Sequence, residues 1–195
     1  MVGRPREFDT EKALDAAMRA FWANGYEATS LVDLMEATGL HKGSLYQAFG
    51  DKHSLFLQSL KRYLDDMRQQ KTALLKAAPT PLEGISAVAH GMIEFANDDC
   101  DCPAGCMAIN TLVELAPHDS RVREVLGAHI SAMRSSLEET VAAAQNQGQI
   151  AKTRSPELIT AIMMTFMAGI GTQMKGTLTK AEAHDLMDAQ MQALM

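Results

Sequence analysis

The sequence predicts an all-α protein, and three observations support this fold class. Ala, Leu, Met, Glu and Gln dominate the composition while Val, Ile and Tyr are scarce, a balance that favours helix over sheet. Apolar residues recur at helical spacing along most of the chain, cap and stop residues separate these stretches, and no convincing strand pattern interrupts them. With 195 residues, 47% hydrophobic content and only six prolines, the chain can bury a full core.

The first third of the chain is expected to form three short helices. Apolar residues from Leu14 to Trp22 mark the first helix, and Leu31 and Leu34 mark the second. A third short helix is expected from about His41 to Phe49. The expected caps are Asp9 or Thr10 for the first helix and Thr29 or Ser30 for the second, and the expected stops are Gly25 and Gly39.

A much longer helix is expected from Lys52 to about Ala78. Its apolar positions, Leu55, Phe56, Leu60, Tyr63, Leu64 and Met67, form one stripe that should be buried. Two prolines then end the pattern. The remaining helices are expected at 82–97, 105–115, 120–147, 156–174 and 179–194.

The second and third helices, joined by a turn that contains glycine, have the layout of a helix-turn-helix. In this motif the second helix enters the major groove of DNA and the residues at its N-terminal end meet base edges. His41 and Lys42 hold that position, and Gly43 lets the backbone approach closely. The candidate DNA contacts of this segment are His41, Lys42, Gly43, Ser44, Tyr46, Gln47 and Lys52.

The spacing alone equally fits an αα-hairpin with a solvated polar face. Arg4 and Arg6 favour the DNA-binding interpretation, because an arginine-bearing arm ahead of the first helix can reach a phosphate or the minor groove. Both alternatives stay open on the residue pattern.

The stretch "GRPREFDTEKALDAAMRAFWANGYEATSLVDLMEATGLHKGSLYQAFGDKHSLF" resembles the N-terminal DNA-binding domain of the TetR/AcrR family of bacterial repressors. The resemblance implies that Thr29, Tyr46 and Lys52 hold phosphates and that residues 41–44 and 47 face the groove. His41 departs from the family pattern, in which small hydroxyl or amide residues are common. The base that it reads is therefore left open.

The resemblance implies a DNA-binding domain at 1–51 and a helical ligand-binding and dimerisation domain at 52–195. The charge distribution also separates two regions. Up to Tyr63 eight Lys and Arg balance eight Asp and Glu, so the whole net charge of −6 comes from the residues after Tyr63. The implied partners are a double-stranded DNA operator, an unknown small-molecule inducer and a second copy of the chain. Repression relieved by ligand is the family's usual behaviour.

A homodimer is also predicted from the last two helices. The helix at 156–174 is apolar on two sides, so two neighbours should cover it, and its Gly169 permits close approach. Completion of an intramolecular core is the alternative interpretation. The candidate dimer contacts are Leu158, Ile162, Phe166, Gly169, Ile170, Leu186, Met187 and Met191.

Fourteen methionines raise the possibility of a deformable ligand pocket, because thioethers repack around varied ligands. Ordinary core packing is the alternative for most of them, and a solvated face is the alternative for the polar candidates. The candidate ligand contacts are Met92, Cys106, Asn110, Glu114, Met133, Met163 and Met167.

The segment "DDCDCPAGCMAINTLVE" gathers the chain's three cysteines. Cys106 opens an expected helix, whose N-terminus favours a thiolate, so it is expected to be the most reactive of them. A regulator that binds metal through Cys100, Cys102 and Cys106 is the alternative function. A buried, unreactive Cys106 is the plainer alternative, and no metal or other cofactor is predicted.

Other classes of protein find little support. The motifs GxSxG, HExxH and the P-loop are absent, so no enzyme and no catalytic residues are predicted. Neither a signal peptide nor a membrane span is expected, because the longest apolar window falls short of the roughly 20 residues that a bilayer requires. A cytoplasmic location is therefore expected.

Overall fold

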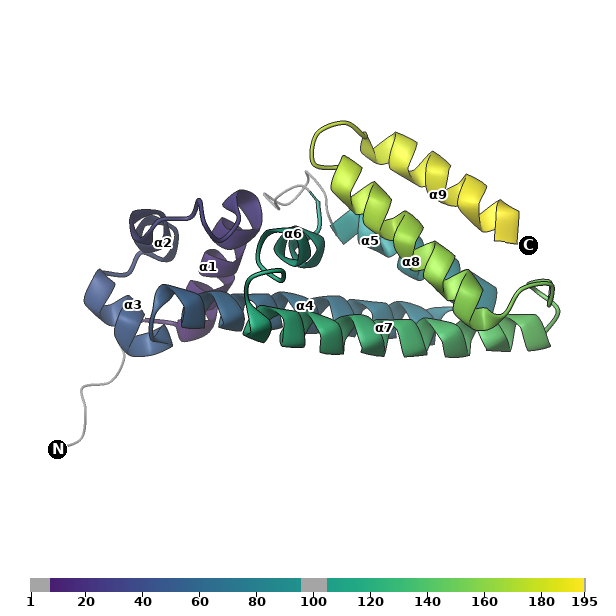
Figure 1. Ribbon diagram of the computed structural model, residues 1–195, viewed down its shortest axis with the longest axis horizontal. Helices are drawn as coiled ribbons and strands as arrows, with labels where there is room; N and C mark the ends of the chain where they lie inside the picture. The colour runs from purple at the N-terminus through teal and green to yellow at the C-terminus, as the bar shows by residue number, and fades with distance from the viewer. Residues whose placement is uncertain (1–7, 96–104, 195) are drawn as a thin grey trace.

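The computed structural model describes residues 8–95 and 105–194, and its regular elements are all α-helices (Figure 1). The predicted fold class is confirmed. The helices are α1 (Thr10–Asn24), α2 (Leu31–Thr38), α3 (Lys42–Phe49), α4 (Lys52–Ala77), α5 (Pro81–Phe95), α6 (Met107–Glu114), α7 (Ser120–Asn146), α8 (Pro156–Gln173) and α9 (Lys180–Leu194).

Short polar residues begin the helices where the sequence indicates. Asp9 begins α1 by accepting hydrogen bonds from the amides of Glu11 and Lys12. Of the two candidates for α2, Ser30 is the cap: its hydroxyl accepts from the amide of Asp33, whose carboxylate accepts from the amide of Ser30. The two long helices, α4 and α7, begin in the same way at aspartates.

The long helices α4 and α7 run side by side along the molecule, with α1, α2 and α3 gathered at one end and α9 at the other (Figure 1). The short helix α6 lies between the first three helices and the rest, and it contacts α4, α7 and α8. One apolar cluster is continuous through α1 to α4, α6 and the start of α7. The first three helices therefore share a core with the body of the molecule.

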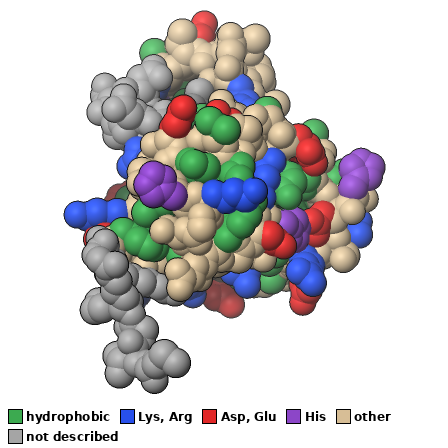
Figure 2. Space-filling model, turned by 90° about the vertical axis from the view of Figure 1, so that its left-hand side faces the viewer, with side chains coloured by type: hydrophobic (Ala, Val, Ile, Leu, Met, Phe, Trp, Pro, Cys, Tyr) green, Lys and Arg blue, Asp and Glu red, His purple; other side chains and the backbone are tan. Residues whose placement is uncertain are grey.

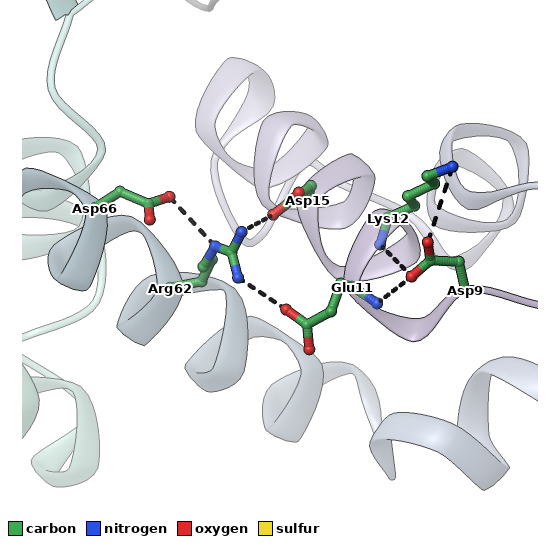
Figure 3. Close-up of polar contacts among 6 residues, drawn as sticks. All are labelled: Asp9, Glu11, Lys12, Asp15, Arg62 and Asp66. Atoms are coloured by element: carbon green, nitrogen blue, oxygen red, sulfur yellow. Dashed lines mark hydrogen bonds and ion pairs between the residues drawn. The ribbon is translucent and has the colours of Figure 1, made fainter.

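Ion pairs join α1 to α4 at the surface (Figure 3). The guanidinium of Arg62 lies 2.8 Å from the carboxylate of Glu11, 3.4 Å from that of Asp15 and 3.3 Å from that of Asp66. Asp15 and the other two acids raise the pKa of Arg62, although its partial burial opposes this. The contacts with Glu11 and Asp15 connect the first helix to α4, whereas Asp66 lies on α4 itself, and they add to the apolar packing between the two helices.

Candidate DNA-binding site and ligand cavity

The surface of α3 presents the polar residues that the sequence singles out. Leu45 and Phe49 are buried against the other helices, whereas Lys42 and Gln47 are exposed and Tyr46 is 39% exposed. The view onto this end of the molecule shows basic, histidine, acidic and hydrophobic side chains together on its surface (Figure 2). This helix face is therefore free to contact a partner.

The start of α3 is open as well. His41 is the N-cap residue but makes no side-chain cap hydrogen bond, and it is exposed, so its ring is not committed to the fold. The amide groups of the first turn of a helix attract anions. The ammonium of Lys52, at the start of α4, lies 4.3 Å from the ring centroid of Tyr26, which limits where its charge can lie.

The prediction that Thr29 holds a phosphate is not supported by the position of its side chain. Thr29 is fully buried, and its hydroxyl donates to the carbonyl of Gly25 at 2.5 Å. A threonine beside a helix start commonly bonds the local backbone in this way, which makes it a turn residue here. Arg4 and Arg6 lie outside the described residues.

Helix α6 connects the first three helices to the body through two hydrogen-bonding contacts. The carboxylate of Glu114 accepts hydrogen bonds from the amides of Tyr26 and Glu27 at 3.1 and 2.9 Å, just after α1. The indole of Trp22 donates to the carbonyl of Gly105 at 3.2 Å, just before α6. The prediction of Glu114 as a ligand contact is therefore wrong: this carboxylate binds backbone amides and does not line a cavity.

A second connection joins α4 to α7. His53 lies 2.5 Å from the carboxylate of Asp119, which also accepts from the amide of Val122 at the start of α7. The helix amide lowers the pKa of Asp119, and His53 adds to the effect. Both ends of the segment that carries α6 are thus attached to the helix-turn-helix end of the molecule.

Gly25 allows the close approach of Glu114. Its φ of +83° is unfavourable for other residues, and a Cβ there would lie 2.9 Å from the carboxylate. We expect Gly25→Ala to lower the free energy of unfolding by about 1–3 kcal/mol, measured by denaturant titration. Gly43→Ala is the matched control, because a Cβ at that helical position meets no atom within 4 Å. Equal stability of the two variants would contradict the assignment.

A cavity with two adjoining lobes lies behind α6. One lobe, of about 250 Å³, lies against α4, α5 and α7; the other, of about 350 Å³, lies against α6, α7 and α8. Met67, His129, Met133 and Met167 line both lobes, so the two lie next to each other. The size is typical of small-molecule sites.

The predicted ligand contacts divide between cavity and core. Met92, Cys106, Met133 and Met167 line the cavity. Met163 does not, because it packs in the cluster that contains Ile159 and Val141. Asn110 is absent from both linings, and its side-chain nitrogen is buried without a hydrogen-bond partner among the described residues.

Cys106 is the N-cap residue of α6 and is only 7% exposed. Its sulfur accepts a hydrogen bond from the hydroxyl of Tyr63 at 3.4 Å. Burial is the main cause that raises the pKa of Tyr63 well above its usual value, and the neighbouring Cys106 raises it further. Cys100 and Cys102 lie outside the described residues. Within residues 8–95 and 105–194 no group of three or more His, Cys, Asp or Glu is arranged to hold a metal.

The predicted dimer contacts also divide in two. Leu158, Ile162 and Leu186 are 51, 37 and 41% exposed, and an open groove of about 520 Å³ between α8 and α9 includes Ile162, Phe166 and Leu186. The Cβ position of Gly169 has open space around it. The prediction is wrong for Met187 and Met191, whose side chains are buried in the protomer's own core. Ile170 is also buried in that core, although it forms part of the groove lining.

No helix among the described residues combines the length and the apolar character needed to cross a bilayer. The fold, with its exposed recognition helix at one end, defines the class of helix-turn-helix DNA-binding regulators. Residues 13–58 match the family model of bacterial regulatory proteins of the tetR family, and residues 81–189 match that of the tetracyclin repressor-like C-terminal domain. The chain belongs to the TetR family of transcriptional regulators.

Individual relatives agree. The HTH-type transcriptional repressor ComR of Escherichia coli (strain K12) is 38% identical over 148 residues, which cover 76% of this chain and 70% of ComR. The uncharacterized regulator YezE of Bacillus subtilis (strain 168) is 30% identical over 76% of both chains. A cysteine mutant of the TetR family regulator CifR, solved with 26-bp double-strand operator DNA, has a TM-score of 0.84 and 28% identity over 99% of this chain and all of its own.

Proposed function

We propose that the chain is a transcriptional repressor that binds a pseudo-palindromic operator as a homodimer and releases it when a small molecule enters the cavity. The observation that carries this proposal is α6, which forms part of the cavity wall and also binds the end of α1. The repressor ComR and the complex of CifR with operator DNA support the DNA-binding part. Such a protein acts in the cytoplasm and is not an enzyme.

In this proposal residues 1–51 read DNA and residues 52–195 bind ligand and a second protomer. His41, Lys42, Gly43, Ser44 and Gln47 face the major groove, where the exposed start of α3 would enter it. Tyr46, which is exposed on α3, and Lys52 at the start of α4 contact phosphates, and Arg4 and Arg6 reach the DNA from the N-terminal arm.

The dimer is proposed to form through the exposed face of α8 and α9. Leu158, Ile162 and Leu186 would pair with the same residues of a second copy, as in a two-fold interface. Phe166 and Gly169 lie along the same groove and would complete the contact. A two-fold dimer presents two recognition helices to two half-sites, which is why a palindromic operator is expected.

Ligand entry would act on DNA binding through α6. Cys106, Ile109 and Leu112 of this segment line the cavity, while Glu114, two residues beyond Leu112, holds the amides after α1. A ligand that displaces α6 would therefore move or loosen the helix-turn-helix. Modification of Cys106 is a second candidate trigger, because the thiol lines the cavity; alkylation only after unfolding would exclude it.

The operator contacts can be tested with single variants. Lys52→Ala should weaken binding to every sequence and flatten the dependence of log affinity on log salt by about one unit, because one phosphate contact is lost. Lys61→Ala, also on α4 and exposed, is the control and should leave the slope unchanged. Gel shifts at several salt concentrations give both slopes; an unchanged slope for Lys52→Ala would remove it from the interface.

His41→Ala should change base preference more than general affinity, because the exposed imidazole at the start of α3 is placed to meet a base edge. Selection from a randomised operator library measures this. An identical selected sequence for the variant and the unmodified protein would exclude base reading by His41.

A further inference from the structure

The charged side chains that line the two-lobed cavity are all basic. Arg68 and Lys71 line the smaller lobe, Arg134 lines the larger one and His129 lines both. Neither lining includes a carboxylate. Since the chain as a whole carries a net charge of −6, this local excess of basic groups runs against its composition.

Lys71 lacks a counter-ion among the described residues. Its neighbour Arg68 is paired with Asp65 at 2.9 Å, but no carboxylate lies within ion-pair distance of Lys71, which is half-buried. Burial is the main cause that lowers the pKa of Lys71, and the positive charge of Arg68 lowers it further. A partly desolvated ammonium without a partner is unfavourable, and an anion beside it would relieve that cost.

His129 lies on the facing helix α7, where the charges of Lys71 and Arg68 act on its imidazole. Burial lowers the pKa of its imidazole, and Lys71 and Arg68 lower it further, while Asp65 opposes them. A neutral imidazole can still donate one hydrogen bond. Lys71 and His129 therefore offer an ammonium and a ring N–H from two helices to one acceptor group.

Apart from His129, Arg134 and Thr165, the larger lobe is lined by apolar side chains and Cys106. Ile109 and Leu112 of α6, Ile130 and Met133 of α7 and Met164 of α8 form its walls. Methionine side chains adapt to flexible chains, and the burial of each methylene contributes about 0.8 kcal/mol. The lobe that contains Lys71 and Arg68 therefore adjoins a largely apolar lobe against α6.

We propose that this cavity binds an amphipathic monoanion, a carboxylate with a flexible apolar tail. The head group lies between Lys71 and His129, and the tail fills the lobe against α6. The inference rests on the proposed function in that the same cavity serves as the inducer site. It deepens that function by specifying the chemical class of the inducer.

Decanoate, decan-1-ol and decylammonium test the class of ligand, because they share one tail and differ in head-group charge. Isothermal titration calorimetry of the full-length protein, below the concentrations at which these compounds form micelles, should show decanoate binding about tenfold or more tighter than decan-1-ol. Decylammonium should bind weakest. Equal binding of the alcohol, tighter binding of the ammonium, or no binding of decanoate would overturn the proposal.

The head-group position is tested with Lys71→Met, which keeps an unbranched side chain of nearly the same length and removes its charge. Decanoate should bind about tenfold more weakly to this variant, while decan-1-ol is unaffected. Lys76→Met, five residues further along α4 and outside both lobes, should bind decanoate as the unmodified protein does. If Lys71→Met binds decanoate as tightly as the unmodified protein does, and circular dichroism shows its helices intact, the placement of the head group is wrong. Retained decanoate binding by Lys71→Arg would show that a positive charge is what the site requires.

A gel shift with operator DNA separates this inference from the proposed function. If the protein binds operator but does not bind decanoate, the ligand class is wrong and the regulator stands. If decanoate binds and Lys71→Met weakens it, but operator is not released, the anion site stands and its role as the inducer site fails. Release of operator by decanoate, reduced in Lys71→Met, supports both.

Discussion

Replacing Leu186 by Asp is expected to convert the protein from dimer to monomer and to abolish operator binding. Leu186 is 41% exposed in the protomer and lies on the open groove between α8 and α9. In the proposed dimer a second copy covers it, and an unpaired carboxylate in such a dry contact costs several kcal/mol. Multi-angle light scattering measures the mass, and a gel shift measures the loss of cooperative binding to two half-sites.

Leu186→Asp tests association and not folding, because Leu186 is exposed in the protomer. Phe166 lines the same groove, but it also packs against the cluster that contains Ile170 and Met187, so a charge there would damage the protomer as well. Val113→Asp is the matched control, since Val113 is 74% exposed on α6 and lies outside the groove. A dimer that survives both Leu186→Asp and Ile162→Asp would place the interface elsewhere.

Local features of the sequence predicted the helices well. The end of α1 at Gly25, the start of α4 at Lys52 and the start of α8 at Pro156 follow from cap residues and helical periodicity, which act over a few positions. The exposed polar face of α3 was predictable for the same reason. Its groove-facing role in DNA binding stays a prediction.

Contacts between distant segments were not predictable from periodicity. Asn110 and Glu114 are four residues apart on one helix, a spacing that favours a shared polar face, yet the carboxylate of Glu114 accepts hydrogen bonds from amides 87 and 88 residues away. Helical periodicity predicts Met67 as part of the buried stripe of α4, but its side chain is half-buried because it lines the cavity. Lys71 and His129 look like residues of solvated helix faces, and only the packing of α4 on α7 brings them to one site.

Replacing Glu114 by Ala is expected to loosen the helix-turn-helix from the body of the molecule. The variant removes a carboxylate that accepts from two backbone amides, and charge-assisted hydrogen bonds of this kind each contribute about 1.5–3 kcal/mol. Hydrogen exchange at the amides of Tyr26 and Glu27 should accelerate, and the melting temperature should fall. Operator affinity should fall about tenfold, because two recognition helices must be ordered again before they can fit half-sites at a fixed spacing.

The control is Glu124→Ala, which removes an exposed carboxylate from α7 and for which no hydrogen bond or ion pair was found among the described residues. It should leave exchange at Tyr26 and Glu27, the melting temperature and operator affinity unchanged. Glu114→Gln is informative beside it, because the amide oxygen keeps one acceptor for the two N–H groups and should give an intermediate result. If Glu114→Ala matches the unmodified protein in both amide exchange and operator affinity, α6 does not hold the helix-turn-helix through this carboxylate. A ligand in the cavity would then act on DNA binding through the other contacts, which are Trp22 with Gly105, His53 with Asp119, and the packing on α4.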